Sequence, residues 1–257
     1  MRGTIVLTEG RSGSNWLTSL TNQVGSLGLS REWFTPKRLG ALTRSKTGPE
    51  LIDHVLEMAK TPNDYFGIKM FPAHLHWFEQ IYHIDLIHHL ASNHDVQLVR
   101  LTRNDRFRQA ISFARGLQTK QWSARAERKA EPVYDFALLC RCYFLVERAY
   151  QYWDSYIAVR DLSVHSFVYE EMMENSPKPF VDCIANHAGV AEVELPQSRY
   201  VVQRDEITEQ WLKQFRKDIA TNGVVGHSTP SRPPHRTIAN IYRLLRGRQL
   251  KPYPYFY

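Results

Sequence analysis

The 257-residue sequence predicts an α/β fold in which helices flank a parallel sheet. One observation predicts this class, and a second predicts that the chain folds as a compact globular protein. Short apolar runs, of the kind that form buried parallel strands, alternate with longer segments of helical periodicity. The composition is 43% hydrophobic and 23% charged, which is typical of a globular protein.

Four apolar runs are predicted to form the strands, at residues 4–8, 65–71, 96–102 and 164–169. The first begins close to Met1, with no charged, apolar and small-residue segments of a signal peptide before it. No run reaches the length of a membrane span. We therefore expect an unprocessed cytoplasmic protein.

Helices are predicted to begin near residues 15, 49, 75 and 105, and a long helix is predicted at 134–159. Two further helices, at 179–188 and 207–221, follow the fourth strand. No linker-like break precedes residue 222, so residues 1–221 are expected to form one domain.

Residues 222–257 are expected to form a C-terminal region that packs on this domain or on a partner. It begins with a loop rich in turn formers, continues with a basic helix at 236–246, and ends in a tail at 251–257. Pro252 and Pro254 exclude a helix in the tail, which we expect to be extended.

Charge and cysteine content exclude several classes of protein. The formal net charge of +7 is a modest bias towards anionic partners, and small phosphorylated molecules satisfy it as well as DNA does. Cys140, Cys142 and Cys183 are odd in number, and the C-x-C pair is shorter than the usual zinc spacings. Neither a disulfide framework nor a metal site is expected.

The turn after the first strand, Glu9-Gly10-Arg11-Ser12-Gly13-Ser14-Asn15-Trp16, is rich in glycine and serine and opens a helix. Such a turn gathers backbone N–H groups and the positive end of a helix dipole, and so can bind phosphate or sulfate. The alternative is a tight turn with an N-cap serine. The lysine of G-x-x-x-x-G-K-[ST] is absent, and neither following strand ends in a magnesium-binding aspartate. The strand, glycine-rich turn and helix are therefore P-loop-like in arrangement, while the missing lysine and aspartate disfavour ordinary kinases and ATPases.

Two blocks together resemble a known family. Arg11-Ser12-Gly13-Ser14 resembles the 5′-phosphosulfate loop of sulfotransferases that use 3′-phosphoadenosine 5′-phosphosulfate (PAPS). The stretch from Arg103 to Ser112, followed by Arg115, Gln118-Thr119 and Trp122, is similar to the R-x-D-x-x-x-Q-A-[VI]-S…R…Q-T…W segment of the bacterial trehalose sulfotransferase family. The resemblance extends through Arg31-Glu32-Trp33-Phe34, Gly67-Ile68-Lys69 and Gln203-Arg204-Asp205…Trp211, and covers about residues 4 to 220.

The resemblance implies a set of cofactor-binding residues. The phosphosulfate would lie against Arg11, Ser12, Gly13, Ser14, Asn15 and Trp16. Arg103 and Ser112 would hold the 3′-phosphate of PAPS, with Arg204 as an added donor, because a guanidinium fork matches phosphate. The alternatives are surface ion pairs: Arg103 with Asp105 or Asp135, and Arg204 with Asp205 or Glu206.

Three residues are expected to be catalytic, and the resemblance implies the first of them. Glu32 matches the proposed general base, and burial beside Trp33 and Phe34 would raise its pKa. Arg11 would stabilise charge on the leaving phosphate. Lys69, at the carboxyl end of its strand, would reach the same site or brace a loop by a salt bridge. An ordinary surface position is the alternative for Glu32.

His74 and His76 are the alternative candidates to Glu32 for the general base, and they could also be read as a pair of metal ligands. Their spacing does not bring two imidazoles together on a helix, and no H-E-x-x-H motif is present. Polar loop positions explain both histidines.

The sequence therefore predicts a PAPS-dependent sulfotransferase that acts on a hydroxyl of a carbohydrate or similar polar acceptor by in-line displacement, without a metal. The aromatic tail and the family resemblance suggest a homodimer. One alternative is a metal-free kinase-like phosphotransferase. Another is a non-catalytic polyanion-binding module, although nucleic-acid recognition motifs are missing from the sequence.

Overall fold

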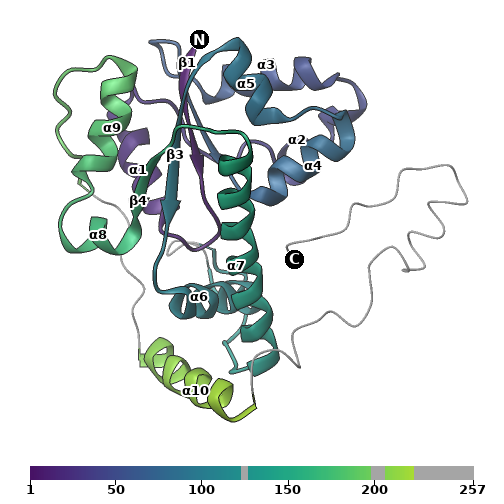
Figure 1. Cartoon of the computed structure of the whole chain (residues 1–257), viewed down its shortest axis with the longest axis vertical. Helices are drawn as coiled ribbons and strands as arrows, with labels where there is room; N and C mark the ends of the chain where they lie inside the picture. Colours follow the sequence, from purple (N-terminus) through teal and green to yellow (C-terminus); the bar gives the residue numbers. More distant parts are fainter. Residues whose placement is uncertain (123–126, 198–205, 223–257) are drawn as a thin grey trace, which may run out of the picture.

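The computed structural model describes residues 1–122, 127–197 and 206–222, and its centre is a parallel sheet of strand order β2-β1-β3-β4 (Figure 1). The strands are β1 (Arg2–Leu7), β2 (Tyr65–Met70), β3 (Asp95–Thr102) and β4 (His165–Val168). The four predicted strands and the α/β class are confirmed. Because all the strands run in one direction, their carboxyl ends meet at one edge of the sheet.

Alternate side chains of β1 reach the two faces of the sheet. Val6 packs in the cluster that includes α1 (Ser14–Val24) and α9 (Lys178–Ala188). Ile5 and Leu7 pack in the opposite cluster, under α3 (Gly48–Ala59), α4 (Pro72–Tyr82), α5 (Leu86–Asn93) and α7 (Phe136–Val159). Figure 1 shows α1 and α9 together on one side of β1 and β3, with α7 on the other. The sheet is thus covered on both faces, as its apolar strands require.

A third apolar cluster lies beyond the carboxyl edge of the sheet. It joins α6 (Arg106–Thr119), the first half of α7 and α10 (Glu206–Asn222), with Phe113, Leu139 and Phe215 buried at its centre. This packing fixes α6, the helix that carries Ser112.

Side-chain caps set several helix starts. Thr47 and Glu50 form a capping box at the start of α3. The carboxylates of Asp105 and Asp135 accept the backbone N–H groups of Arg108 and Leu138, each at 2.9 Å, and so begin α6 and α7. These acidic residues are therefore caps.

Four short elements were not expected. The helix that begins at Pro72 ends before His83, whose φ is 56°, and Asp85 then caps the separate helix α5. The others are α2 (Pro36–Leu39), the 3₁₀ helix η1 (Leu42–Arg44) and α8 (Tyr169–Glu174). Elements of three to eight residues are too short to show a period. Tyr169 begins α8, so the fourth strand ends one residue earlier than predicted.

The predicted basic helix at 236–246, the tail at 251–257 and Arg204 lie outside the described residues.

Candidate functional site

The residues between β1 and α1 form a tight loop at the carboxyl edge of the sheet. Gly13 caps α1 with a φ of 89°, and a Cβ at this position would lie 2.2 Å from the ring of Tyr169. Glycine satisfies both the left-handed backbone and this close approach. Gly13 has no side chain with which to cap the helix, and the positive dipole end of α1 faces the loop.

Several loop side chains form contacts within the protein. Ser12 Oγ accepts a hydrogen bond from the Thr8 hydroxyl at 2.8 Å and one from the Ser14 N–H at 3.4 Å. Trp16 packs edge-on against Tyr169, with ring centroids 6.0 Å apart. These contacts shape the loop, and its backbone is the part that suits an anion.

The loop is also attached to the helices beyond the sheet. Gln109 of α6 donates to the Gly10 carbonyl at 2.8 Å, and the Tyr150 hydroxyl of α7 donates to Gln109 at 3.2 Å. Gln109, which belongs to the sequence block from Arg103 to Ser112, therefore helps to hold the loop in position.

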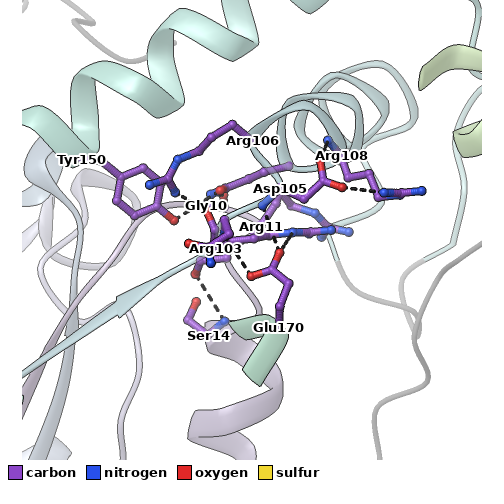
Figure 2. Close-up of polar contacts among 12 residues, drawn as sticks. Gly10, Arg11, Ser14, Arg103, Asp105, Arg106, Arg108, Tyr150 and Glu170 are labelled. Carbon is purple, nitrogen blue, oxygen red and sulfur yellow. Dashed lines mark hydrogen bonds and ion pairs between the residues drawn. The ribbon is translucent and has the colours of Figure 1, made fainter. Parts of the chain in front are cut away.

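Arg11 and Ser112, predicted from separate blocks, lie together. The Nε of Arg11 donates to Ser112 Oγ at 2.7 Å, and its Nη1 donates to the Trp122 carbonyl at 2.8 Å. Arg103 Nη1 donates to the Arg11 carbonyl at 3.0 Å. Figure 2 shows Arg11 and Arg103 side by side, with Glu170 next to them. Arg11, Arg103 and Ser112 are called the arginine cluster below.

Among the residues that the structure describes, positive charge exceeds negative charge in the arginine cluster. Burial and the neighbouring charges of Arg103 and Arg115 lower the pKa of Arg11 to about 10. Burial also lowers the pKa of Arg103. Glu170 lies 3.7 Å from Arg103 Nε, but its carboxylate also accepts the N–H groups of Asn104 and Asp105. An anion with several oxygens would relieve this excess.

Arg103 does not form the surface pair that was considered as the alternative. Asp105 caps α6 and pairs with Arg108, while Asp135 caps α7. The Arg103 guanidinium instead lies over the ring of Tyr169, 4.9 Å from its centroid. Its Nε is buried and has no hydrogen-bond acceptor within the described part of the chain.

Glu32 and Lys69 form a second cluster at the edge of the sheet. The Lys69 Nζ lies 2.9 Å from Glu32 Oε1, and the side chain of Lys69 is only 4% exposed. Lys69 also donates to Asn15 Oδ1, which links this pair to the first turn of α1. The loop therefore contacts the arginine cluster through Arg11 and the Glu32–Lys69 pair through Asn15.

Backbone hydrogen bonds to the outer edge of β2 fix the position of the segment that carries Glu32. The Lys69 N–H donates to the Arg31 carbonyl at 2.9 Å, and Arg31 and Lys60 form bridges opposite Ile68 and Phe66. The segment before Glu32 is thus hydrogen-bonded to the strand that carries Lys69.

The expected rise in the pKa of Glu32 is wrong. Burial acts to raise this pKa, but the charge and hydrogen bond of Lys69, aided by Arg38, bring it below its usual value. Glu32 is therefore ionised at neutral pH. Trp33 is 5% exposed and its indole N–H donates to the carbonyls of Leu29 and Gly67, so its ring belongs to the core.

His74 and His76 are not loop residues, because both lie in α4. Burial lowers the pKa of His74 to about 4, so its imidazole is neutral at neutral pH. His76 packs against Tyr152, with ring centroids 4.7 Å apart. Within residues 1–122, 127–197 and 206–222, no group of three His, Cys, Asp or Glu could hold a metal ion. No helix in the same ranges is long and apolar enough to cross a membrane.

Three site residues were missed by the sequence analysis: Glu9, Tyr169 and Glu170. Glu9 is 4% exposed, and its place directly after the predicted apolar strand at 4–8 was an available signal. Tyr169 and Glu170 reach the site from the unexpected helix α8, for which the sequence gives no local signal.

No curated protein matches the sequence significantly. A family model described as Stf0 sulphotransferase matches residues 3–218, a stretch that contains the loop, the arginine cluster and the Glu32–Lys69 pair. This match spans most of the chain and confirms the resemblance found in the two sequence blocks. It favours sulfuryl transfer over a kinase-like reaction or polyanion binding without catalysis. The chain belongs to the Stf0 sulfotransferase family and is a transferase that moves a sulfuryl group.

Proposed function

We propose that the donor is PAPS and that the acceptor is a hydroxyl of a carbohydrate or similarly polar molecule. The observation that carries the donor assignment is the arginine cluster next to the β1–α1 loop. The backbone of the loop and the side chains of Arg103 and Ser112 are two adjacent places for negative charge. A nucleotide with a 5′-phosphosulfate and a 3′-phosphate has two matching anionic groups.

The donor set fits this nucleotide. Arg103 has a buried Nε without an acceptor, and Arg11 and Ser112 lie within 2.7 Å of each other. We assign Arg103 and Ser112 to the 3′-phosphate and the backbone of residues 11–14 to the phosphosulfate, with Arg204 as a further donor. PAPS bound in this way supplies an activated sulfuryl group.

Glu32 is assigned as the general base. Its lowered pKa keeps the carboxylate ionised at neutral pH, so it is ready to accept a proton. The same low pKa makes it a weak base towards a free hydroxyl. Proton transfer to Glu32 therefore becomes favourable only as the new O–S bond forms and acidifies the attacking hydroxyl.

Lys69 and Arg11 are assigned to the charge that develops on the leaving phosphate. Lys69 is buried and is hydrogen-bonded to Asn15 of the first turn of α1, so its ammonium is held in place before the reaction. Fixed cations and N–H groups stabilise such a transition state without reorganisation. The products would be a sulfate ester and adenosine 3′,5′-bisphosphate.

The donor assignment is tested by thermal unfolding with nucleotides. Adenosine 3′,5′-bisphosphate is expected to raise the Tm because it binds only the folded chain. At 100 times its Kd it should increase the free energy of unfolding by about 2.7 kcal/mol. Adenosine 5′-phosphate lacks the 3′-phosphate and is expected to do much less. Adenosine 2′,5′-bisphosphate is the control for charge alone. Equal stabilisation by all three nucleotides would contradict the assignment of a 3′-phosphate site.

The reaction itself is tested by transfer of labelled sulfuryl from PAPS to an extract of candidate acceptors, followed by mass analysis of the product. A labelled sulfate ester of a sugar would support the carbohydrate assignment. A labelled product of another chemical class would replace that acceptor and leave the donor assignment intact.

A further inference from the structure

Glu9 is a buried acidic residue that the mechanism above does not use. It is the second residue after β1 and directly precedes the Gly10–Arg11 turn of the loop. Its side chain is 4% exposed, and its Oε1 accepts the Gly10 N–H at 2.7 Å. The other oxygen, Oε2, is buried and has no hydrogen-bond partner within the described residues.

This environment favours the neutral carboxyl. An ionised Glu9 would be a buried anion with one hydrogen bond and no ion pair to a described residue, which is far more costly than a buried neutral carboxyl. In agreement, burial raises the pKa of Glu9 to about 7, against the hydrogen bond from Gly10. The charge of Glu32 adds to the rise.

The groups that face Glu9 do not neutralise it. Glu32 approaches from the edge of β2, and its own cation, Lys69, is paired with it. Tyr150 approaches from α7, and burial raises the pKa of its hydroxyl, so it is neutral. Arg106 of α6 is stacked on this phenol, with its guanidinium carbon 3.5 Å from the ring centroid.

His74 of α4 adds no positive charge. Burial lowers its pKa to about 4, and its ring is stacked on Phe71. None of these groups offsets the repulsion between an ionised Glu9 and an added negative charge, and a proton on Glu9 removes that repulsion.

We infer that Glu9 is a proton-linked binding determinant for the sulfuryl donor: its carboxyl must be neutral when the phosphosulfate lies in the β1–α1 loop. This inference rests on the proposed function. Glu9 is two residues from Arg11, and like charges in a buried, poorly screened site repel strongly. Donor binding to the ionised form therefore takes one proton from solvent onto the Glu9 carboxylate.

The size of the effect follows from the pKa of about 7. If only the neutral form binds, the apparent Kd increases about twofold at pH 7 and about 11-fold at pH 8, with almost no change at pH 6. Glu9→Gln keeps the shape and removes the titration. Glu57→Gln is the matched control, because Glu57 is an exposed glutamate paired with Lys60 near the start of β2.

The test is calorimetry with PAPS on the wild type, Glu9→Gln and Glu57→Gln at pH 6, 7 and 8, in two buffers that differ in ionisation enthalpy. The 3′-phosphate of PAPS titrates identically with all three proteins and cancels in the comparison. The wild type and Glu57→Gln should lose about tenfold more affinity than Glu9→Gln between pH 6 and pH 8, and should take up nearly one additional proton at pH 8.

The same pH dependence in the wild type and Glu9→Gln would overturn the inference and leave the proposed function standing. Absence of PAPS binding to all three folded proteins would overturn both. If Glu9→Gln does not fold, the wild type is titrated with adenosine 5′-phosphosulfate, which has no group that titrates between pH 6 and pH 8. A Kd that is independent of pH in that titration would also overturn the inference.

Discussion

Arg103→Ala is expected to weaken the binding of adenosine 3′,5′-bisphosphate without unfolding the protein. Arg103 donates to the Arg11 carbonyl and lies over Tyr169, while its Nε has no acceptor within the described residues. Its removal deletes a charged donor pair for the 3′-phosphate. Hydrogen bonds to charged groups contribute about 1.5–3 kcal/mol, so the Kd should increase about 10- to 150-fold.

The effect of Arg103→Ala on stability is expected to be smaller. The variant loses one hydrogen bond, about 0.5–1.5 kcal/mol, and one cation–π contact, about 0.5–1 kcal/mol. It also removes a buried donor without an acceptor and relieves repulsion with Arg11. Glu170 keeps its hydrogen bonds from Asn104 and Asp105. The net loss should stay below about 2 kcal/mol.

Calorimetric titration of the purified variant measures the Kd, and thermal unfolding of the same sample measures stability. Arg108→Ala is the matched control, because Arg108 is on α6 and pairs with Asp105 and Glu209. An unchanged Kd in folded Arg103→Ala would make Arg103 a structural residue. An equal loss of nucleotide affinity in Arg108→Ala would show that binding depends only on the general positive charge of this region.

Two predictions concern the acidic residues. Glu32→Gln keeps an oxygen that can accept from Lys69, so the Kd for the nucleotide should be unchanged, while kcat should decrease about 10²- to 10⁴-fold in steady-state transfer assays. A kcat near that of the wild type would discard Glu32 as the base and direct attention to His74. Glu9 has a pKa raised from 4.5 to about 7, so the folded chain binds more protons than the unfolded chain in this range. Stability should therefore fall by up to about 3 kcal/mol as the pH rises from about 4.5 to 7 and slightly beyond, and Glu9→Gln should lack this fall in chemical denaturation. Parallel pH profiles of the two proteins would contradict the assignment of a buried neutral carboxyl.

The sequence predicted those parts of the fold that are set by local patterns. Apolar runs gave the strands, and helical periodicity gave the long helices. The tight turn between β1 and α1 was predictable because Gly13 and the serines on either side of it are neighbours in the chain. The hydrogen bond between Arg11 and Ser112 was not predicted, because the resemblance assigned these residues to different groups of the donor and they are 101 positions apart in the chain.

The parts that were missed depend on contacts between distant segments. The low pKa of Glu32 results from Lys69, 37 positions away, and the approach of these residues requires the edge of β2. Tyr169 and Glu170 come from a helix of six residues that shows no period. The histidines of α4 were placed in a loop because the Pro72 start, which extends the helix to include them, was not recognised.

The bridges on the outer edge of β2 have a further consequence, for aggregation. A bare edge strand offers its backbone N–H and C=O groups to strands of other molecules. Here Arg31 and Lys60 occupy positions opposite Ile68 and Phe66, and every residue of β2 is buried. Because Glu32 directly follows Arg31, the segment that shields the edge also carries the candidate base. Deletions in this segment should therefore lower solubility and catalytic activity together.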